Sequence, residues 1–117
     1  MPRKKMQFLQ KPSCTSCRKS KAYLESRGVE LQLRDLDTER LSVDELESLI
    51  GSRDYRLFLN TRNEMYRTGK MKENPPSRKE AIKLMAAHPN LIRRPVVISG
   101  KRLALGYDEK AYEELLQ

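Results

Sequence analysis

The chain's only two cysteines stand three positions apart, at Cys14 and Cys17, with Thr and Ser between them. Cysteines this close cannot link distant parts of a secreted scaffold, so their spacing indicates thiol chemistry instead. A short mixed run containing Met6 and Phe8 precedes the pair, and residues 17–27 contain neither Gly nor Pro. A strand-like run followed by a helix-forming segment places the pair at a strand-to-helix turn.

A metal site is the alternative use of paired thiols. A structural zinc ion takes four ligands, and the sequence has no second cysteine pair. His88 is the only histidine, and it precedes Pro89, where a helix is expected to end. A place at the helix terminus is therefore favoured over a catalytic role for His88. We expect redox use of Cys14 and Cys17 and no bound metal.

The segment after the cysteines completes a β-α-β unit. Val29, Leu31 and Leu33 alternate with polar residues, which is the period of a half-buried strand. Gly28 stands before them as a helix stop. Crossover connections of this kind make the two strands parallel and put the helix on one face of the sheet.

A helical insert is predicted over residues of about 41–88. Ser42 to Glu45 and Ser77 to Glu80 both have the spacing of a capping box, and apolar residues follow each at helical intervals. The first stripe consists of Val43, Leu46, Leu49 and Ile50, and the second of Ala81, Ile82, Leu84 and Met85. Helices joined by short connections pack on one another, so the insert should form its own cluster.

The last segment predicts a hairpin and a closing helix. Residues 95–98, Pro-Val-Val-Ile, are typical of a strand buried on both faces, and Ser99-Gly100 supplies a tight turn into residues 101–105. Asp108 can cap a last helix whose stripe contains Tyr112, which we expect, like Tyr107, to be a packing residue.

The predicted order of elements is β-α-β, helical insert, β-β-α. This order fits an α/β fold with a four-stranded mixed sheet flanked by helices, and with a Cys-x-x-Cys at the first turn it is the thioredoxin-like arrangement. At 117 residues the chain suits one domain over residues 1–117.

The composition excludes some functions. The chain has 24 Lys and Arg against 16 Asp and Glu, a net charge of +8, which favours nucleic acid, an acidic protein face or oxyanions as partners. Aromatic residues make up 6% of the chain, which leaves little for base stacking, so direct nucleic-acid binding is not expected. The apolar run 95–98 is too short to span a bilayer and no signal-like stretch is present, so we expect a soluble, cytoplasmic protein without a membrane partner.

The predicted turn also assigns roles to the two thiols. Cys14 stands just before a helix, where backbone N–H groups, the helix dipole and the nearby Arg18 and Lys19 would favour its thiolate. Cys17 lies one turn into the helix on the same side. We therefore assign Cys14 as the nucleophile and Cys17 as the resolving cysteine, with Arg18 as a candidate anion-binding residue.

Two further arginines are candidates for the same site. A proline is tolerated at the start of a buried strand, and in this fold type the proline at the position of Pro95 faces the redox turn, commonly after a cis peptide bond. Arg94 would then lie beside Cys14, where a guanidinium stabilises a thiolate or binds an oxyanion. Arg62 is the second candidate, although an isolated arginine is ordinarily a solvated surface charge.

Four segments of the chain resemble the arsenate reductase family, including its Spx-like branch. They are Pro-Ser-Cys-Thr-Ser-Cys-Arg-Lys at 12–19, Asn-Thr-Arg at 60–62, Leu-Ile-Arg-Arg-Pro at 91–95 and Leu-Gly-Tyr-Asp-Glu at 105–109. The resemblance implies a thioredoxin-like sheet with a helical insert. It also implies one nucleophilic cysteine with three arginines around an oxyanion, and glutaredoxin with glutathione as electron donors.

The resemblance leaves two functions open. Cys14, Arg62 and Arg94 match three of the four implied residues, but the third arginine has no match, since residues 105–107 read Leu-Gly-Tyr. Cys17 is the feature that resembles the Spx-like branch, whose members use a Cys-x-x-Cys disulfide as a switch and bind the C-terminal domain of the RNA polymerase α subunit. We expect either a reductase-like thiol oxidoreductase served by glutathione and glutaredoxin or by thioredoxin, or a redox-sensing transcription regulator. Neither function implies a bound cofactor.

Overall fold

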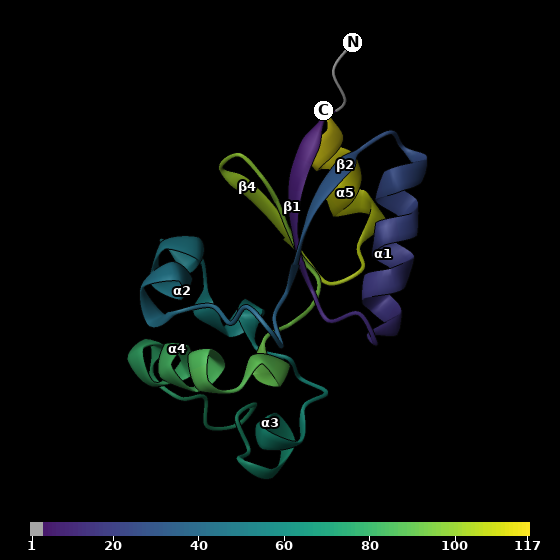
Figure 1. Ribbon diagram of the computed structural model, residues 1–117. Helices are drawn as coiled ribbons and strands as arrows, with labels where there is room; N and C mark the ends of the chain where they lie inside the picture. The colour runs from purple at the N-terminus through teal and green to yellow at the C-terminus, as the bar shows by residue number, and fades with distance from the viewer. Residues whose placement is uncertain (1–3) are drawn as a thin grey trace. The chain divides into compact units, whose positions relative to one another are not determined.

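The computed structural model describes residues 4–117 (Figure 1). These residues form four strands, β1 (Lys5–Gln10), β2 (Glu30–Asp35), β3 (Val96–Ser99) and β4 (Arg102–Leu105). Five α-helices accompany them: α1 (Thr15–Ser26), α2 (Val43–Ile50), α3 (Glu64–Thr68), α4 (Arg78–Ala87) and α5 (Glu109–Leu116). Two short 3-10 helices, η1 (Tyr55–Phe58) and η2 (Pro89–Leu91), lie between α2 and β3.

The four strands form one mixed sheet in the order β2-β1-β3-β4. β1 and β2 are parallel, whereas β3 is antiparallel to both β1 and β4. The parallel pair is the predicted β-α-β unit, and the antiparallel pair β3–β4 is the predicted hairpin. The α/β fold with a four-stranded mixed sheet of thioredoxin-like arrangement is therefore confirmed.

The chain divides into two compact units, residues 4–38 with 94–117, and residues 39–93. The first contains the sheet, α1 and α5, and the second contains α2, α3, α4 and both 3-10 helices. The predicted helical insert at about 41–88 falls within the second unit. Our expectation that the whole chain is one domain stays a prediction.

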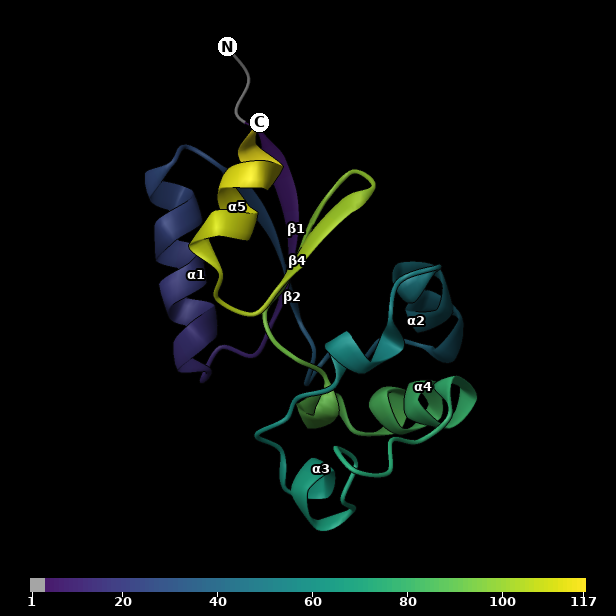
Figure 2. The same ribbon diagram turned by 180° about the vertical axis from the view of Figure 1, so that it is seen from behind.

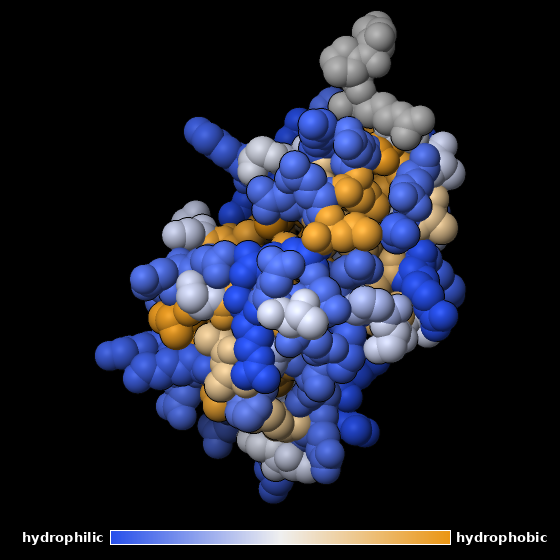
Figure 3. Space-filling model, viewed as in Figure 1, coloured by the Kyte–Doolittle hydropathy of each residue, from blue (hydrophilic) through white to orange (hydrophobic). Residues whose placement is uncertain are grey.

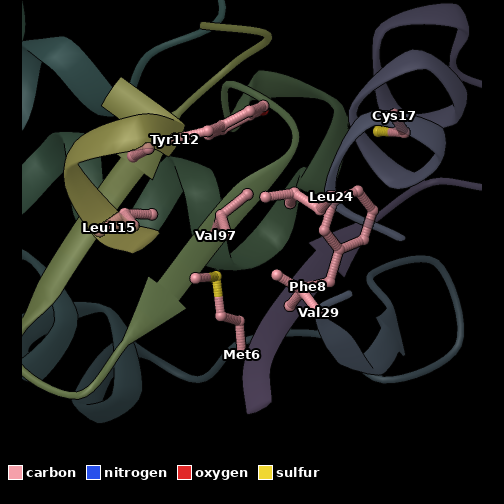
Figure 4. Packing of buried hydrophobic residues seen from close by; sticks show 9 residues of the cluster. Met6, Phe8, Cys17, Leu24, Val29, Val97, Tyr112 and Leu115 are labelled. Atoms are coloured by element: carbon pink, nitrogen blue, oxygen red, sulfur yellow. The ribbon is translucent and has the colours of Figure 1, made fainter. Parts of the chain in front are cut away.

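The core of the first unit lies between the sheet and two helices. Figures 1 and 2 show α1 and α5 side by side, and the Tyr23 hydroxyl of α1 donates a hydrogen bond to Glu113 of α5. Both helices cover the same face of the sheet, because their buried side chains form one cluster with those of β1, β3 and β4. Figure 4 shows this cluster, whose members are Met6, Phe8, Cys17, Leu24, Val29, Val97, Ala104, Tyr112 and Leu115.

The edge strand β2 is less buried than its sequence pattern predicts. Val29 is buried and Leu31 packs against the core, but Leu33 is 48% exposed. The prediction of a uniformly half-buried apolar face was therefore wrong at Leu33. The physical reason is that β2 has a neighbouring strand on one side only, so the alternation of its side chains does not guarantee burial.

The two predicted helix starts in the second unit are present. The hydroxyl of Ser42 accepts a hydrogen bond from the Glu45 N–H while the Glu45 carboxylate accepts one from the Ser42 N–H, which completes a capping box for α2. Ser77 caps α4 by accepting from the Glu80 N–H. Val43, the first residue of the predicted apolar stripe, is 41% exposed because it begins the first turn of α2.

The cluster of the second unit is built by both helices and by η1. Its fully buried side chains include Leu46, Ile50, Phe58, Ile82 and Met85. On the surface the Arg78 guanidinium of α4 forms a salt bridge with Glu47 of α2, at 3.1 Å. The predicted packing of the insert helices on one another is therefore present.

Candidate redox site

Cys14 is the N-cap of α1 and lies at the turn where β1 leads into the helix. Its backbone is extended, with φ −79° and ψ 124°, and its Sγ accepts a hydrogen bond from the Cys17 N–H at 3.4 Å. Its carbonyl accepts from the Arg18 N–H at 3.1 Å, which closes the first helical turn. The thiol thus takes the place that Ser or Asp holds at an ordinary N-cap, facing the helix's unpaired N–H groups.

The surroundings of Cys14 favour its thiolate. Partial burial acts to raise the pKa of this thiol, but hydrogen bonds from the Cys17 thiol and from the Cys17 and Ser16 N–H groups, together with the charge of Arg94, outweigh it. The net result is a Cys14 pKa below its ordinary value. Cys14 is half-buried, so the residue keeps part of its surface open to a reacting partner.

Cys17 has the opposite character. It is fully buried, and burial together with the neighbouring Cys14 raises its pKa to about 12, against the opposing effects of the Lys11 N–H and the Arg94 charge. The two sulfurs therefore differ in both exposure and acidity. An accessible thiolate beside a buried neutral thiol is the arrangement in which the first attacks and the second resolves.

Lys11 holds both cysteines through its backbone. Its N–H donates to the Cys17 sulfur, and its carbonyl accepts from the Cys14 N–H at 2.9 Å. Its ammonium group lies 3.6 Å from a carboxylate oxygen of Asp37, just beyond β2. Sequence reasoning missed this residue, because main-chain hydrogen bonds leave no mark on side-chain identity.

Arg94 and Pro95 come to the redox turn from the start of β3. Since β3 runs antiparallel to β1, its first residues lie at the sheet edge where β1 ends. The Arg94–Pro95 peptide bond is cis, as expected, and the Pro95 carbonyl accepts from the Gly106 N–H at 2.8 Å. The guanidinium of Arg94 is close enough to both thiols for its charge to lower their pKa values.

The other predicted arginines are exposed side chains in two different units of the chain. Arg18 and Lys19 are exposed on α1, and the cation that lowers the Cys14 pKa is Arg94. Arg62 belongs to the unit of residues 39–93, where it is exposed and its N–H donates to Asn60 Oδ1 at 3.1 Å. Anion binding by Arg18 and Arg62 stays a prediction.

Tyr112 is a packing residue, as predicted, and also a polar one. Its buried hydroxyl contacts the Ser20 hydroxyl of α1 at 2.7 Å and the carbonyl of Gly106, and its ring lies edge-on to Tyr107. Burial raises the pKa of Tyr112 to about 12, and the nearby Cys17 adds to this shift. Ser20 follows Cys17 on the buried side of α1, so Tyr112 ties α5 to the redox helix.

Within residues 4–117 no group of three or more His, Cys, Asp or Glu side chains is placed to hold a metal ion. Over the same part of the chain, no helix has the length and apolar character needed to cross a membrane.

Comparison with known proteins identifies the family. The model of the ArsC family matches residues 9–115. Among curated proteins, the global transcriptional regulator Spx of Bacillus subtilis is 32% identical over 107 residues, which cover 90% of this chain and 82% of Spx. Spx of Streptococcus pyogenes serotype M1 is 35% identical over 103 residues, which cover 84% of this chain and 75% of Spx.

Solved structures agree with this assignment. An ArsC family related protein from Bacteroides fragilis has a TM-score of 0.84 at 29% identity, covering 95% of this chain and 98% of its own. The arsenate reductase from Vibrio cholerae has a TM-score of 0.82 at 26% identity, covering 96% and 98%. The matched region includes the Cys14 turn, the Arg94–Pro95 segment and the last helix, and the chain therefore belongs to the ArsC family.

Proposed function

We propose that this chain is a thiol–disulfide redox protein in which Cys14 attacks and Cys17 resolves. The observation that carries the proposal is the contrast between the two sulfurs. Cys14 is accessible and has a lowered pKa, whereas Cys17 is buried one turn away and has a pKa of about 12. A reductase is the first candidate function, because its reaction needs one thiol that attacks and a second that resolves the mixed disulfide.

The proposed reaction transfers two electrons to a disulfide substrate. The Cys14 thiolate attacks one substrate sulfur, so that a mixed disulfide forms and the other substrate sulfur leaves as a thiolate that takes up a proton. Cys17 then loses its proton to solvent and attacks the Cys14 sulfur, which releases the second substrate thiolate. The chain is left with a Cys14–Cys17 disulfide, which an external thiol donor, glutathione with glutaredoxin or thioredoxin, reduces again.

Formation of the mixed disulfide prepares Cys17 for its attack. The hydrogen bond to Cys14 and the Cys14 charge both raise the pKa of Cys17 in the dithiol state. Both effects disappear once the Cys14 sulfur is bound to the substrate and neutral, while the Lys11 N–H and the Arg94 charge continue to favour the Cys17 thiolate. The second thiol thus becomes more acidic at the step that requires it.

Arg94 is proposed to stabilise negative charge beside Cys14, and Arg62 and Arg18 to contribute to binding an anionic group. Pro95 would hold the Arg94 backbone at the turn. Glutathione carries carboxylates, so a glutathionylated thiol fits these cations without requiring a third arginine. We therefore favour a glutathionylated substrate over arsenate.

The test follows reduction of a glutathionylated peptide with glutaredoxin or thioredoxin as donor, and of arsenate in parallel. Cys14→Ser is expected to abolish turnover, and Cys17→Ser to accumulate a mixed disulfide that intact-mass spectrometry detects. Undiminished turnover by Cys14→Ser, or no turnover by the wild type with any donor, would overturn the enzyme reading.

A redox-switched transcription regulator is the second candidate. The observation in its favour is that curated relatives sharing 32 to 35% identity over most of this chain are named global transcriptional regulators. The partner implied is the C-terminal domain of the RNA polymerase α subunit. Pull-downs with that domain, in the dithiol and disulfide states, test this reading. Binding in one state only would support a switch, and no binding in either state would remove it.

A further inference from the structure

The outer edge of β2 has backbone groups directed away from the sheet. In the four-stranded sheet of the described residues, β2 has β1 as its single neighbour. The Glu30 N–H donates to the Lys4 carbonyl at 2.8 Å, so the backbone of Glu30 faces β1. Because these directions alternate along a strand, the N–H and C=O groups of Leu31 and Leu33 face outward.

The same two residues place apolar side chains beside this edge. Leu33 is 48% exposed, and Leu31 is partly buried against the core. Figure 3 shows hydrophobic side chains at the surface in the region where Figure 1 draws β2 and α5. Soluble proteins commonly protect an edge strand with charged side chains, a proline or a bulge. The sequence Glu-Leu-Gln-Leu-Arg-Asp of β2 contains no proline, and the charged Glu30 and Arg34 lie on the face opposite to the two leucines.

The sequence of β2 is complementary to itself when two copies run antiparallel. With Gln32 opposite Gln32 of a second copy, Leu31 lies opposite Leu33 and Glu30 lies opposite Arg34. The apolar side chains then share one face, because both belong to positions of the same parity. On the other face each carboxylate meets a guanidinium, so the charges are complementary at both ends of the pairing.

We propose that two copies of this chain associate through their β2 edges, with a two-fold axis at Gln32. The register makes each Leu31–Leu33 pair a hydrogen-bonded pair, in which the outward N–H and C=O groups of both residues are satisfied by the second copy. The two four-stranded sheets become one continuous sheet. The contact is isologous, as a two-fold dimer requires, and it closes so that no further copies add at this edge.

This association is independent of the proposed redox chemistry. The two β2 strands run in opposite directions, so the redox turns, which lie where β1 and β2 end, are at opposite ends of the joined sheet. None of the residues at the contact is a proposed catalytic residue. A monomeric protein would therefore not contradict the proposed redox function, and a protein without redox activity would not contradict the proposed dimer.

Charge reversal tests the contact without disturbing the core. Sedimentation velocity over a range of concentrations, under reducing conditions, is expected to show a monomer–dimer equilibrium for the wild type. Glu30→Arg would place like charges opposite one another in both symmetry-related pairs and weaken the dimer by about tenfold. Glu30→Arg with Arg34→Glu restores opposite charges and should restore dimerisation. Glu114→Arg, at an exposed position of α5, changes the net charge of the chain equally and is expected to leave the dimer unchanged.

A cross-link tests the register itself. In the background Cys14→Ser with Cys17→Ser, a cysteine introduced by Gln32→Cys faces its own copy across a non-hydrogen-bonded pair, where Cα atoms are about 4.5 Å apart and a disulfide can form. Mild oxidation is expected to yield a covalent dimer. Gln7→Cys is the matched control, because Gln7 is also exposed and is the β1 residue that pairs with Gln32. It lies one strand further from the proposed two-fold axis, so it is expected to give no covalent dimer.

The results of these experiments either support or overturn the proposed dimer. A dimer that Glu30→Arg weakens, the double reversal restores and Gln32→Cys traps supports the proposal. A wild type that stays monomeric at every concentration overturns it, as does a dimer that Glu30→Arg leaves unchanged. Equal trapping of Gln7→Cys and Gln32→Cys would also contradict the proposed register. Circular dichroism of each variant excludes unfolding as the cause of a lost dimer.

Discussion

The backbone N–H of Cys17 donates to the Sγ of Cys14 at 3.4 Å, so the proposed resolving residue stabilises the proposed nucleophile before any reaction begins. The contact exists because Cys14 is the N-cap of α1 and Cys17 is the third residue of that helix. An N-cap side chain accepts from this N–H in ordinary helices as well. The Cys-x-x-Cys spacing therefore matches the geometry of a helix start, and the thiolate gains stabilisation from helix formation itself.

The charge of Arg94 should be measurable in the acidity of Cys14. Replacing Arg94 with Gln removes a cation that lowers this pKa, so the thiolate should form at higher pH. Where the working pH lies below the thiol pKa, the thiolate fraction and the rate of alkylation fall by about tenfold for each unit by which the pKa rises. The measurement is iodoacetamide modification against pH, with Cys14 followed by peptide mass spectrometry.

Arg93→Gln provides the matched control, because Arg93 is exposed and precedes Arg94 in the chain. Its substitution should leave the Cys14 profile in place. Equal shifts for both variants would show that the long-range field of the chain, rather than the position of Arg94, determines the acidity of the thiol.

The capping box of α2 should contribute to stability. Ser42→Ala removes the acceptor of the Glu45 N–H and leaves the first turn of the helix without its cap. The expected loss is about 1 kcal/mol in the free energy of unfolding, measured by urea denaturation. Ser48→Ala, in the exposed middle of the same helix, should be neutral or slightly stabilising because Ala is the better helix former. An equal change in the free energy of unfolding for the two substitutions would show that Ser42 does not stabilise α2 as a cap.

Features encoded by local sequence were predictable. The capping residues Ser42, Ser77 and Asp108 act where their spacing placed them, and Gly28 has the positive φ of 78° that a helix stop uses. Each depends on a few neighbouring residues whose side chains or conformational freedom have a single use at that position. The cis bond before Pro95 followed from the fold that these elements imply.

Features that depend on tertiary surroundings were not predictable. The exposure of Leu33 depends on which side of β2 is covered, and the alternating pattern is the same for a covered and an open edge. The role of Lys11 depends on main-chain groups that every residue possesses. The sequence thus predicted the site of the two cysteines, but not the backbone hydrogen bonds between Lys11 and both of them.

The Tyr112 hydroxyl should matter to stability despite its place in an apolar core. Tyr112→Phe removes the hydrogen bonds with Ser20 and the Gly106 carbonyl while keeping the ring, and leaves buried polar groups without this partner. The expected cost is about 1 to 3 kcal/mol in the free energy of unfolding. Tyr107→Phe is the control, since the Tyr107 hydroxyl donates to Glu109 on the surface, and its effect on the free energy of unfolding should be much smaller. Comparable losses from the two variants would contradict a special role for the buried hydroxyl.

The buried thiol of Cys17 should make stability depend on alkaline pH. Its pKa rises from an ordinary value of 9.0 to about 12 on folding, so the folded chain holds this proton more tightly than the unfolded chain. The resulting stabilisation is fully present below pH 9.0 and is lost as the pH rises towards about 12. Urea unfolding of the reduced protein at increasing pH should therefore show a falling midpoint, and Cys17→Ala should show a flatter dependence. The Tyr112 pKa also rises to about 12, in part through Cys17, and the Cys17 thiol lowers the Cys14 pKa, so the difference between the two proteins reports the ionisation of Cys17 together with its effects on Cys14 and Tyr112. Parallel curves for the wild type and Cys17→Ala would mean that Cys17 ionises as readily in the folded chain as in the unfolded one, and the asymmetry on which the resolving role depends would be absent.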